Sequence, residues 1–208
     1  MPRCNAPNFE IQDNRTPPAA GYNPIMRCLR IVAAGILFLA LLGEADVRQC
    51  ICDAARPETM QSRECGLCRA ADAEPPGPEF FAIRDANPSK PNRWLELPRF
   101  HGRNPQDLAG MTAAQRAAYW TAAIAKAREL WGDGWGLAVN SLENRSQCHM
   151  HIHIGKLPAG AEDSRFVEVA TPADIPLPRQ DDGIWVHPVA GKLHVHYGDD
   201  SPELLLER

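Results

Sequence analysis

Three histidines, His149, His151 and His153, alternate with apolar residues in the segment HMHIHI at positions 149–154. In an extended strand, residues two apart point to the same face and lie about 7 Å from each other. The three imidazoles therefore share one face of a predicted strand, and the Met and Ile side chains share the other. A lone histidine in a strand usually has a packing role, whereas three on one polar face indicate a functional site.

Two kinds of chemistry suit this spacing. Two imidazoles separated by one residue can share a metal ion, as in zinc hydrolases that carry an H-x-H strand. Alternatively, the middle imidazole is a nucleophile and its flanking partners orient it. The spacing alone does not choose between them.

One long helix is predicted at residues 112–131, ahead of the histidine segment. Thr112 and Gln115 match the capping box T-x-x-Q at its start, and Gly132 and Gly134 end it. The apolar residues within it recur at helical spacing and form one stripe, so its tryptophans are expected in the core.

Short strands are predicted on either side of this helix. Residues 80–83 and 94–97 are apolar, β-prone and separated by a turn, which indicates a hairpin. Further strands are expected at 136–140, 166–170, 184–187 and 192–197. One long helix among short strands predicts an α+β fold.

The length of 208 residues suits one domain with extensions, and the net charge of -4 gives no argument for a nucleic-acid polymer as partner. An unbroken apolar run at 31–42 follows Arg27 and Arg30, which is typical of a signal peptide. We therefore expect residues 1–25 to be dispensable, 26–48 to be a signal peptide or anchor, and the protein to be exported to the periplasm or the extracellular space. The alternative is a buried helix or a membrane-anchoring helix, and the anchoring helix would keep the protein close to a membrane.

A cysteine-rich stretch at 49–75 precedes the proline-rich break at 75–78. Its four cysteines are Cys50, Cys52, Cys65 and Cys68. Export favours disulfides among them, whereas the C-x-x-C spacing of the last two suits zinc in a reducing compartment. We place a catalytic domain at 76–160 and a β-rich extension at 161–208.

Several segments occur in the order found in the histidine-triad superfamily, and with similar spacing. They are FAIRDANP at 81–88, LELPRFH at 95–101, Asp107-Leu108 before the capped helix, LAVN at 137–140 and the histidine run itself. The chain thus resembles this superfamily over roughly residues 65–157. The resemblance implies an antiparallel sheet with one main helix, to which this chain adds a short β-rich C-terminal extension.

Within the superfamily, the context of Asn140-Ser141, Arg145-Ser146-Gln147 and the histidine run is most similar to the CDP-diacylglycerol pyrophosphatase branch. The common nucleotide-hydrolase branch has Gln at the position of Arg145. The resemblance implies hydrolysis of a phosphoanhydride in a nucleotide or nucleotide-lipid substrate, with no catalytic cofactor. A nucleotidyltransferase, a dinucleoside polyphosphate hydrolase and a non-catalytic zinc- or nucleotide-binding module are the alternatives. Family members often form homodimers, but nothing in this sequence indicates an interface.

The resemblance assigns roles to individual residues. His151 is the nucleophile, with its second ring nitrogen held by a backbone carbonyl, and His153 would hydrogen-bond the phosphoryl or leaving oxygen. His149 completes the triad. Donors to the phosphate oxygens would be Asn140, Ser146 and Gln147, while Arg145 would bind the pyrophosphate and Asp85 the ribose. For Asp85 a turn role fits nearly as well, and loop hydrogen bonds are the alternative for Asn140 and Ser146.

The resemblance also implies a structural zinc site made of Cys65, Cys68, His101 and His149. A disulfide network is the competing interpretation. Near the C-terminus, His187, His194 and His196 include a second H-x-H pair. A second metal site, a flap over the pocket and a solvated hairpin are the interpretations left open for these three.

Overall fold

The helix α3 (Ala113–Trp131) begins and ends where the sequence predicts. In this computed structural model, which describes residues 47–103, 106–179 and 182–208, the Thr112 hydroxyl accepts a hydrogen bond from the Gln115 backbone at 3.2 Å. The Gln115 side chain accepts one from the Thr112 backbone at 3.0 Å, which completes the capping box. Gly132 ends the helix with a φ of 58°, a left-handed conformation that glycine adopts without strain.

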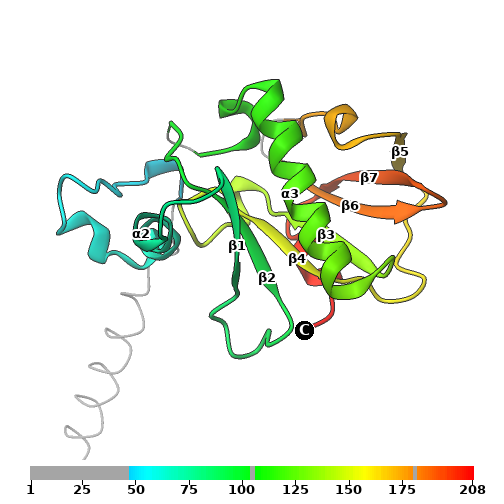
Figure 1. Cartoon of the computed structure of the whole chain (residues 1–208), viewed down its shortest axis with the longest axis horizontal. Helices are drawn as coiled ribbons and strands as arrows, with labels where there is room; N and C mark the ends of the chain where they lie inside the picture. The colour runs from blue at the N-terminus through cyan, green and yellow to red at the C-terminus, as the bar shows by residue number, and fades with distance from the viewer. Residues whose placement is uncertain (1–46, 104–105, 180–181) are drawn as a thin grey trace, which may run out of the picture. The chain divides into compact units, whose positions relative to one another are not determined.

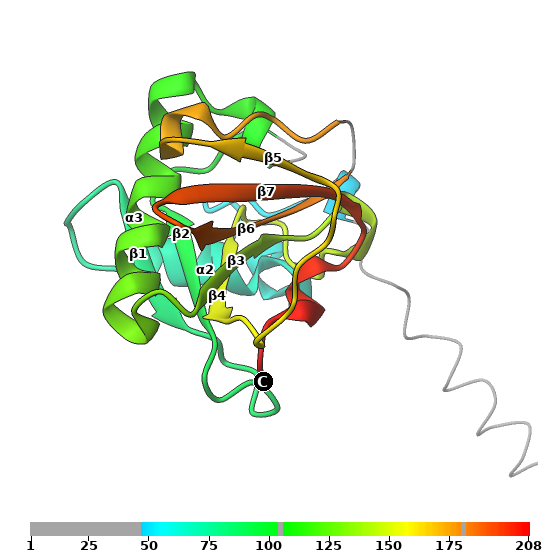
Figure 2. The same cartoon turned by 90° about the vertical axis from the view of Figure 1, so that its right-hand side faces the viewer.

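In the described part of the chain, seven antiparallel strands make a single sheet in the order β1-β2-β4-β3-β6-β7-β5. They are β1 (Phe80–Arg84), β2 (Trp94–Pro98), β3 (Trp135–Val139), β4 (Ile152–Lys156), β5 (Phe166–Val169), β6 (Gly183–Val189) and β7 (Lys192–Asp199). Figure 2 shows β5, β7, β6, β3 and β4 following one another across the sheet. The α+β class, the first hairpin and the strands predicted at 136–140, 166–170, 184–187 and 192–197 are confirmed, whereas the histidine strand is shorter than predicted.

One face of the sheet carries the main hydrophobic core. The helix α3 packs over this face (Figure 1) and buries Tyr119, Trp120 and Ile124 against it. The sheet contributes alternate residues, among them Leu137 and Ile152. Trp120 is 1% exposed, so the prediction that it is a core residue is confirmed.

The opposite face carries a different row of side chains. His153 pairs with Ala138, Ala138 with Trp185, and Trp185 with His196 across four neighbouring strands. Residues directly opposite each other on paired strands point to the same face. His153 and His196 therefore share the face that α3 does not cover, which we call the histidine face.

Residues 161–208 belong to the same sheet as the rest of the chain. Strand β6 pairs with β3, and the described residues from Val47 onward form one compact unit. The last element, the short 3₁₀ helix η7 (Pro202–Leu205), contacts β3 and β6. Next to it, Leu206 packs with Ala138 and Trp185 on the histidine face. The C-terminus is thereby held close to the histidine strand.

A short helix and several 3₁₀ turns make up the remaining regular structure of the described residues. These are α2 (Gly66–Ala73), η1 (Val47–Gln49), η2 (Thr59–Gln61), η3 (Arg63–Cys65), η4 (Leu108–Gly110), η5 (Leu142–Asn144) and η6 (Pro172–Asp174). The predicted extension at 1–25 and nearly all of the predicted signal segment at 26–48 lie outside the described residues. Among the helices of the described part, none is long and apolar enough to cross a membrane.

Candidate active site

The histidine strand is shorter than the sequence predicts, because β4 begins only at Ile152 and both His149 and His151 precede it. The alternation nevertheless persists. Met150, Ile152 and Ile154 join the core under α3, while the three histidines are not part of that core. All three are buried, with exposed fractions of 6% or less.

His151 has a defined proton position. Its Nδ1 lies 2.8 Å from the backbone carbonyl of His149, and because a carbonyl only accepts, Nδ1 carries the hydrogen. Nε2 is consequently the nitrogen with the free lone pair. Burial lowers the pKa of His151 to about 4, so the ring is neutral at pH 7. A neutral imidazole with an available Nε2 is the form that a nucleophilic histidine requires.

His153 lies beside His151, and the two rings are 4.8 Å apart in an edge-to-face arrangement. Burial holds its pKa well below the usual range. Among the described residues, neither of its ring nitrogens has a hydrogen-bond partner. Buried polar groups in folded proteins are nearly always satisfied, so this ring is suited to meeting a ligand.

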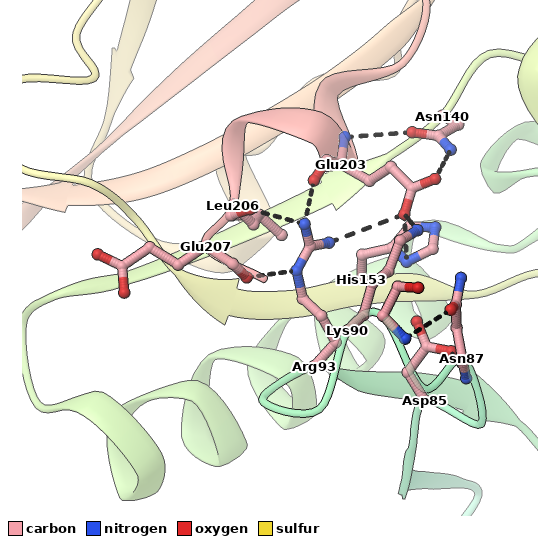
Figure 3. Close-up of polar contacts among 10 residues, drawn as sticks. Asp85, Asn87, Lys90, Arg93, Asn140, His153, Glu203, Leu206 and Glu207 are labelled. Carbon is pink, nitrogen blue, oxygen red and sulfur yellow. Dashed lines mark hydrogen bonds and ion pairs between the residues drawn. The ribbon is translucent and has the colours of Figure 1, made fainter. Parts of the chain in front are cut away.

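The side-chain carboxylate of Glu203, which lies near the C-terminus, approaches His153, as Figure 3 shows. The Glu203 Oε2 atom lies 3.4 Å from His153 Nδ1, 2.5 Å from Lys90 Nζ and 3.7 Å from Arg93 Nη1. Burial alone would raise the pKa of Glu203, but the hydrogen bond and charge of Lys90, with help from Asn140 and Arg93, lower it overall. Glu203 is therefore ionised at neutral pH.

Arg93 fixes the segment that carries Glu203. Its guanidinium donates to the backbone carbonyls of Glu203, Leu206 and Glu207 at 2.5, 2.7 and 2.8 Å. The side chain is 1% exposed, and burial lowers its pKa. A buried arginine with three carbonyl partners fastens the end of the chain to the turn between β1 and β2.

Lys90, Arg93 and Glu203 were not predicted as site residues. Lys90 and Arg93 lie in the turn after the segment Asp85-Ala86-Asn87-Pro88, and Glu203 lies near the end of the chain. A basic pair in an otherwise short hairpin loop is the only sequence signal for them. Nothing in the residue pattern links that loop to a glutamate more than 100 positions away.

Asn140 and Gln147 are engaged within the protein. Asn140 Nδ2 donates to Glu203 Oε1 at 3.2 Å, and its Oδ1 accepts from the Glu203 backbone at 3.2 Å. Gln147 accepts from the Leu67 backbone and donates to the Arg63 carbonyl, each at 3.0 Å. Both amides thus position neighbouring segments. Ser146, by contrast, is exposed.

Arg145 is buried and points its guanidinium at backbone carbonyls, those of Asn140 and Gln106. Burial lowers its pKa. It also lines a cleft of about 440 Å³ with Leu108, Val139 and other residues, and none of the three triad histidines is in that lining. Asp85 accepts a hydrogen bond from the Asn87 backbone at 2.9 Å, which is the turn role weighed for it.

Three of the four predicted zinc ligands converge. The donor atoms of Cys68, His101 and His149 all lie within 4.8 Å of one another. His149 Nε2 donates to the Pro98 carbonyl at 2.7 Å, and His101 Nε2 lies 2.9 Å from Asp72. In each ring the second nitrogen is left for an ion, and such outer partners are usual for metal-bound histidines. His149 Nδ1 is buried and has no partner among the described residues, which also fits a metal.

The structure contradicts the prediction that Cys65 is the fourth zinc ligand. Cys65 forms a disulfide with Cys52, so its sulfur is not available as a thiolate. Cys148, which directly precedes the histidine run, forms a second disulfide with Cys50. These pairings differ from a network confined to the four clustered cysteines, because one bond reaches the residue next to the histidine triad. Cys68 remains a buried free thiol, and burial raises its pKa to about 11.

Comparison with protein-family models finds no matching family, and comparison with curated proteins finds no matching relative. The likeness to histidine-triad proteins therefore rests on the motifs quoted above. What the site can do chemically follows from the positions and protonation of its side chains.

Proposed function

We propose that this protein is a hydrolase of the histidine-triad type that cleaves a phosphoanhydride in a nucleotide-containing substrate through a phosphohistidine at His151. The observation that carries the proposal is the tautomer of His151. Its Nδ1–H is held by the His149 carbonyl, which leaves Nε2 unprotonated. The α+β sheet with one long helix on one face is compatible with a histidine-triad fold.

The first step forms a bond from Nε2 of His151 to phosphorus and breaks the bond from phosphorus to the bridging oxygen. The electron pair of the broken bond stays with the departing phosphate. His153, whose Nε2 has no hydrogen-bond partner among the described residues, is placed to hydrogen-bond that oxygen. Water then attacks the phosphohistidine, and the nitrogen–phosphorus electron pair returns to Nε2. The proton of the water passes to solvent or to the released phosphate.

The positive charges around the site suit an anionic substrate. Lys90 is 18% exposed and pairs with Glu203, whose carboxylate lies 3.4 Å from His153 Nδ1. Arg145 donates to backbone carbonyls, so in this proposal it supports the loop before the histidine run. It does not hydrogen-bond the substrate, and its positive charge attracts the substrate's phosphates from a distance. Ser146, which is exposed, and Lys90 are then the residues that we propose to contact the substrate.

A pyrophosphate ester of the CDP-diacylglycerol kind is the favoured substrate. The motif context around Asn140 and Arg145 resembles that branch of the superfamily. The two disulfides suit an oxidising compartment, which agrees with an exported protein that meets lipid-linked nucleotides. We further propose that Cys68, His101 and His149 hold a structural zinc ion next to the triad.

The decisive experiment incubates the purified full chain with CDP-diacylglycerol, adenosine phosphoramidate and a dinucleoside polyphosphate, and follows the products by phosphorus NMR. We expect the first substrate to have the highest kcat/KM. A tenfold or larger preference for either of the others, about 1.4 kcal/mol in transition-state stabilisation, would reject the substrate class but not the chemistry. A product in which phosphate or a sugar phosphate has replaced water would show a transferase.

Two variants test the mechanism itself. His151→Ala should abolish turnover while circular dichroism stays unchanged, because no other group can replace the nucleophile. Arg128→Ala, a change at an exposed position of α3, should behave like the wild type. Turnover by His151→Ala at a tenth of the wild-type rate would reject the covalent mechanism.

A further inference from the structure

A second cluster of potential metal ligands lies on the histidine face, away from the triad. It consists of Glu162, His187, His194 and His196, whose donor atoms all lie within 4.8 Å of one another. The three histidines are buried, with exposed fractions of 7%, 7% and 1%. The solvated hairpin, one of the interpretations left open by the sequence, is therefore wrong for these residues.

The hairpin turn between β6 and β7 brings the histidines together. Ala190 and Gly191 have φ values of 49° and 83°, as expected for a two-residue turn that matches the twist of a hairpin. This turn sets the register in which His187 faces His194, and the alternation along β7 then places His196 on the same side. Glu162 reaches the three rings from the loop between β4 and β5.

The spacing of the donor atoms matches one small cation. His187 Nε2 lies 3.1 Å from His196 Nε2 and 3.5 Å from Glu162 Oε2. Glu162 Oε1 lies 3.3 Å from His194 Nδ1 and 3.4 Å from His196 Nε2. Ligands about 2.0–2.1 Å from a tetrahedral zinc ion are separated from one another by about 3.4 Å. The four measured separations fall around this value.

Neighbouring aromatic residues hold the rings in place. His196 stacks on Trp185 with ring centroids 3.6 Å apart, and His194 stacks on Phe166 at 3.8 Å. The second nitrogen of His194 lies 3.7 Å from Glu168, the kind of outer carboxylate that orients a metal-bound imidazole. An ion that binds here would meet ligands that are already arranged, which lowers the entropy cost of coordination.

This cluster is separate from the triad. His153 on β4 and His196 on β7 belong to the same cross-strand row but are three strands apart. Strands are spaced by about 4.8 Å, so the two residues lie roughly 14 Å from each other. An ion in the cluster would not touch a phosphorus atom bound at His151.

We propose that Glu162, His187, His194 and His196 bind one divalent transition-metal ion of the zinc class. Three imidazoles and one carboxylate fill a tetrahedral shell, and a site with four protein ligands is closed, as structural zinc sites are. The ion fastens the Glu162 loop to the β6–β7 hairpin and so stabilises the C-terminal part of the sheet. The inference stands independently of the proposed enzymatic activity.

Cobalt(II) binding to the full chain tests the site, because the absorption spectrum of cobalt reports its geometry and ligand type. Cys68→Ser serves as the background, since it removes the only sulfur ligand of the other candidate site. We expect one ion per chain with the intense d–d absorption of tetrahedral coordination and no thiolate charge-transfer band. Zinc should displace the cobalt and raise the melting temperature.

Glu162→Gln and His194→Asn should each weaken cobalt binding by more than about 100-fold, beyond what the loss of an outer-shell partner usually costs. Glu162 is exposed, so its substitution leaves the fold intact. Asp163→Asn is the matched control, because it removes the same charge one residue away and should change binding by less than about threefold. Absence of tight binding in the Cys68→Ser chain, an octahedral spectrum, or equal affinities of the Glu162 and Asp163 variants would each overturn the proposal.

Discussion

Glu203→Gln is the substitution that tests whether the C-terminal segment, which carries Glu203, contributes to the proposed active site. The change keeps the size of the side chain and removes its charge. In the wild type this carboxylate lies within ion-pairing distance of Lys90, Arg93 and His153, and it also accepts a hydrogen bond from Asn140. Its side chain is 15% exposed, so solvent screens these contacts only in part.

The expected loss of stability follows from what each partner can do after the change. Removing one member of a fully buried ion pair costs about 3–5 kcal/mol. Lys90 is 18% exposed and can turn toward water, and Arg93 keeps its three carbonyl partners. We therefore expect a smaller decrease in the free energy of unfolding, about 1–3 kcal/mol at pH 7.

The pH dependence of this loss has a definite sign. The pKa of Glu203 is lowered in the folded protein, so its stabilising contribution is present above the unfolded-state value near 4.5 and disappears as the pH falls through the lower folded-state value. The difference in stability between wild type and Glu203→Gln should thus be largest at neutral pH. It should shrink steadily below about pH 4.5.

Urea unfolding at several pH values measures the stability, and steady-state kinetics measure the activity. We expect kcat to fall by about tenfold or more with a smaller change in KM. The reason is that Glu203 orients the His153 ring and places a negative charge beside it, but does not bind the substrate. Glu207→Gln is the matched control, since that side chain pairs with Lys156 at 3.3 Å and not with the triad. Equal kinetics and stability of the two variants would refute a role for Glu203 in the site.

Three further outcomes are expected. Because burial lowers the pKa of His151 to about 4, protonation removes the nucleophilic lone pair only in acid, so kcat/KM should show an acidic limb near pH 4; a limb near the ordinary value of about 6.5 would contradict the buried, neutral ring. Replacing both Cys50 and Cys148 by Ser should lower the free energy of unfolding by about 2–4 kcal/mol, since this disulfide joins residues 98 positions apart, and an unchanged urea midpoint would argue against the bond. Strong chelation should lower the melting temperature but leave the initial rate of hydrolysis unchanged, because both candidate metal sites are proposed as structural; prompt loss of activity that zinc restores, with unchanged circular dichroism, would show a catalytic metal.

The sequence by itself determined the long helix, most of the strands and which residues around His151 share a face. The capping box at Thr112, the helical stripe and the alternation around His151 are short-range patterns, and each one limits the backbone directly. The β-prone segments were likewise located by their composition. A local pattern of this kind shows which residues share a face, and it does not depend on the contacts that the segment makes with distant parts of the chain.

Tertiary structure alone decided which distant residues meet. Glu203 reaches His153 because Arg93 binds the carbonyls of the C-terminal segment, an arrangement that no spacing in the sequence encodes. Asn140 resembled a phosphate ligand in its motif, yet its amide is taken up by Glu203.

The cysteines and the C-terminal histidines show the same limit. Cys65 fits a zinc motif by spacing, but the position of Cys52 directs it into a disulfide. The H-x-H pair of β7 is recognisable as part of a metal site only in the folded structure, where the hairpin register places His187 opposite it and the loop supplies Glu162. Metal ligands and ion pairs depend on distances of a few ångströms between segments far apart in the chain, and those distances are set by sheet order and turn geometry.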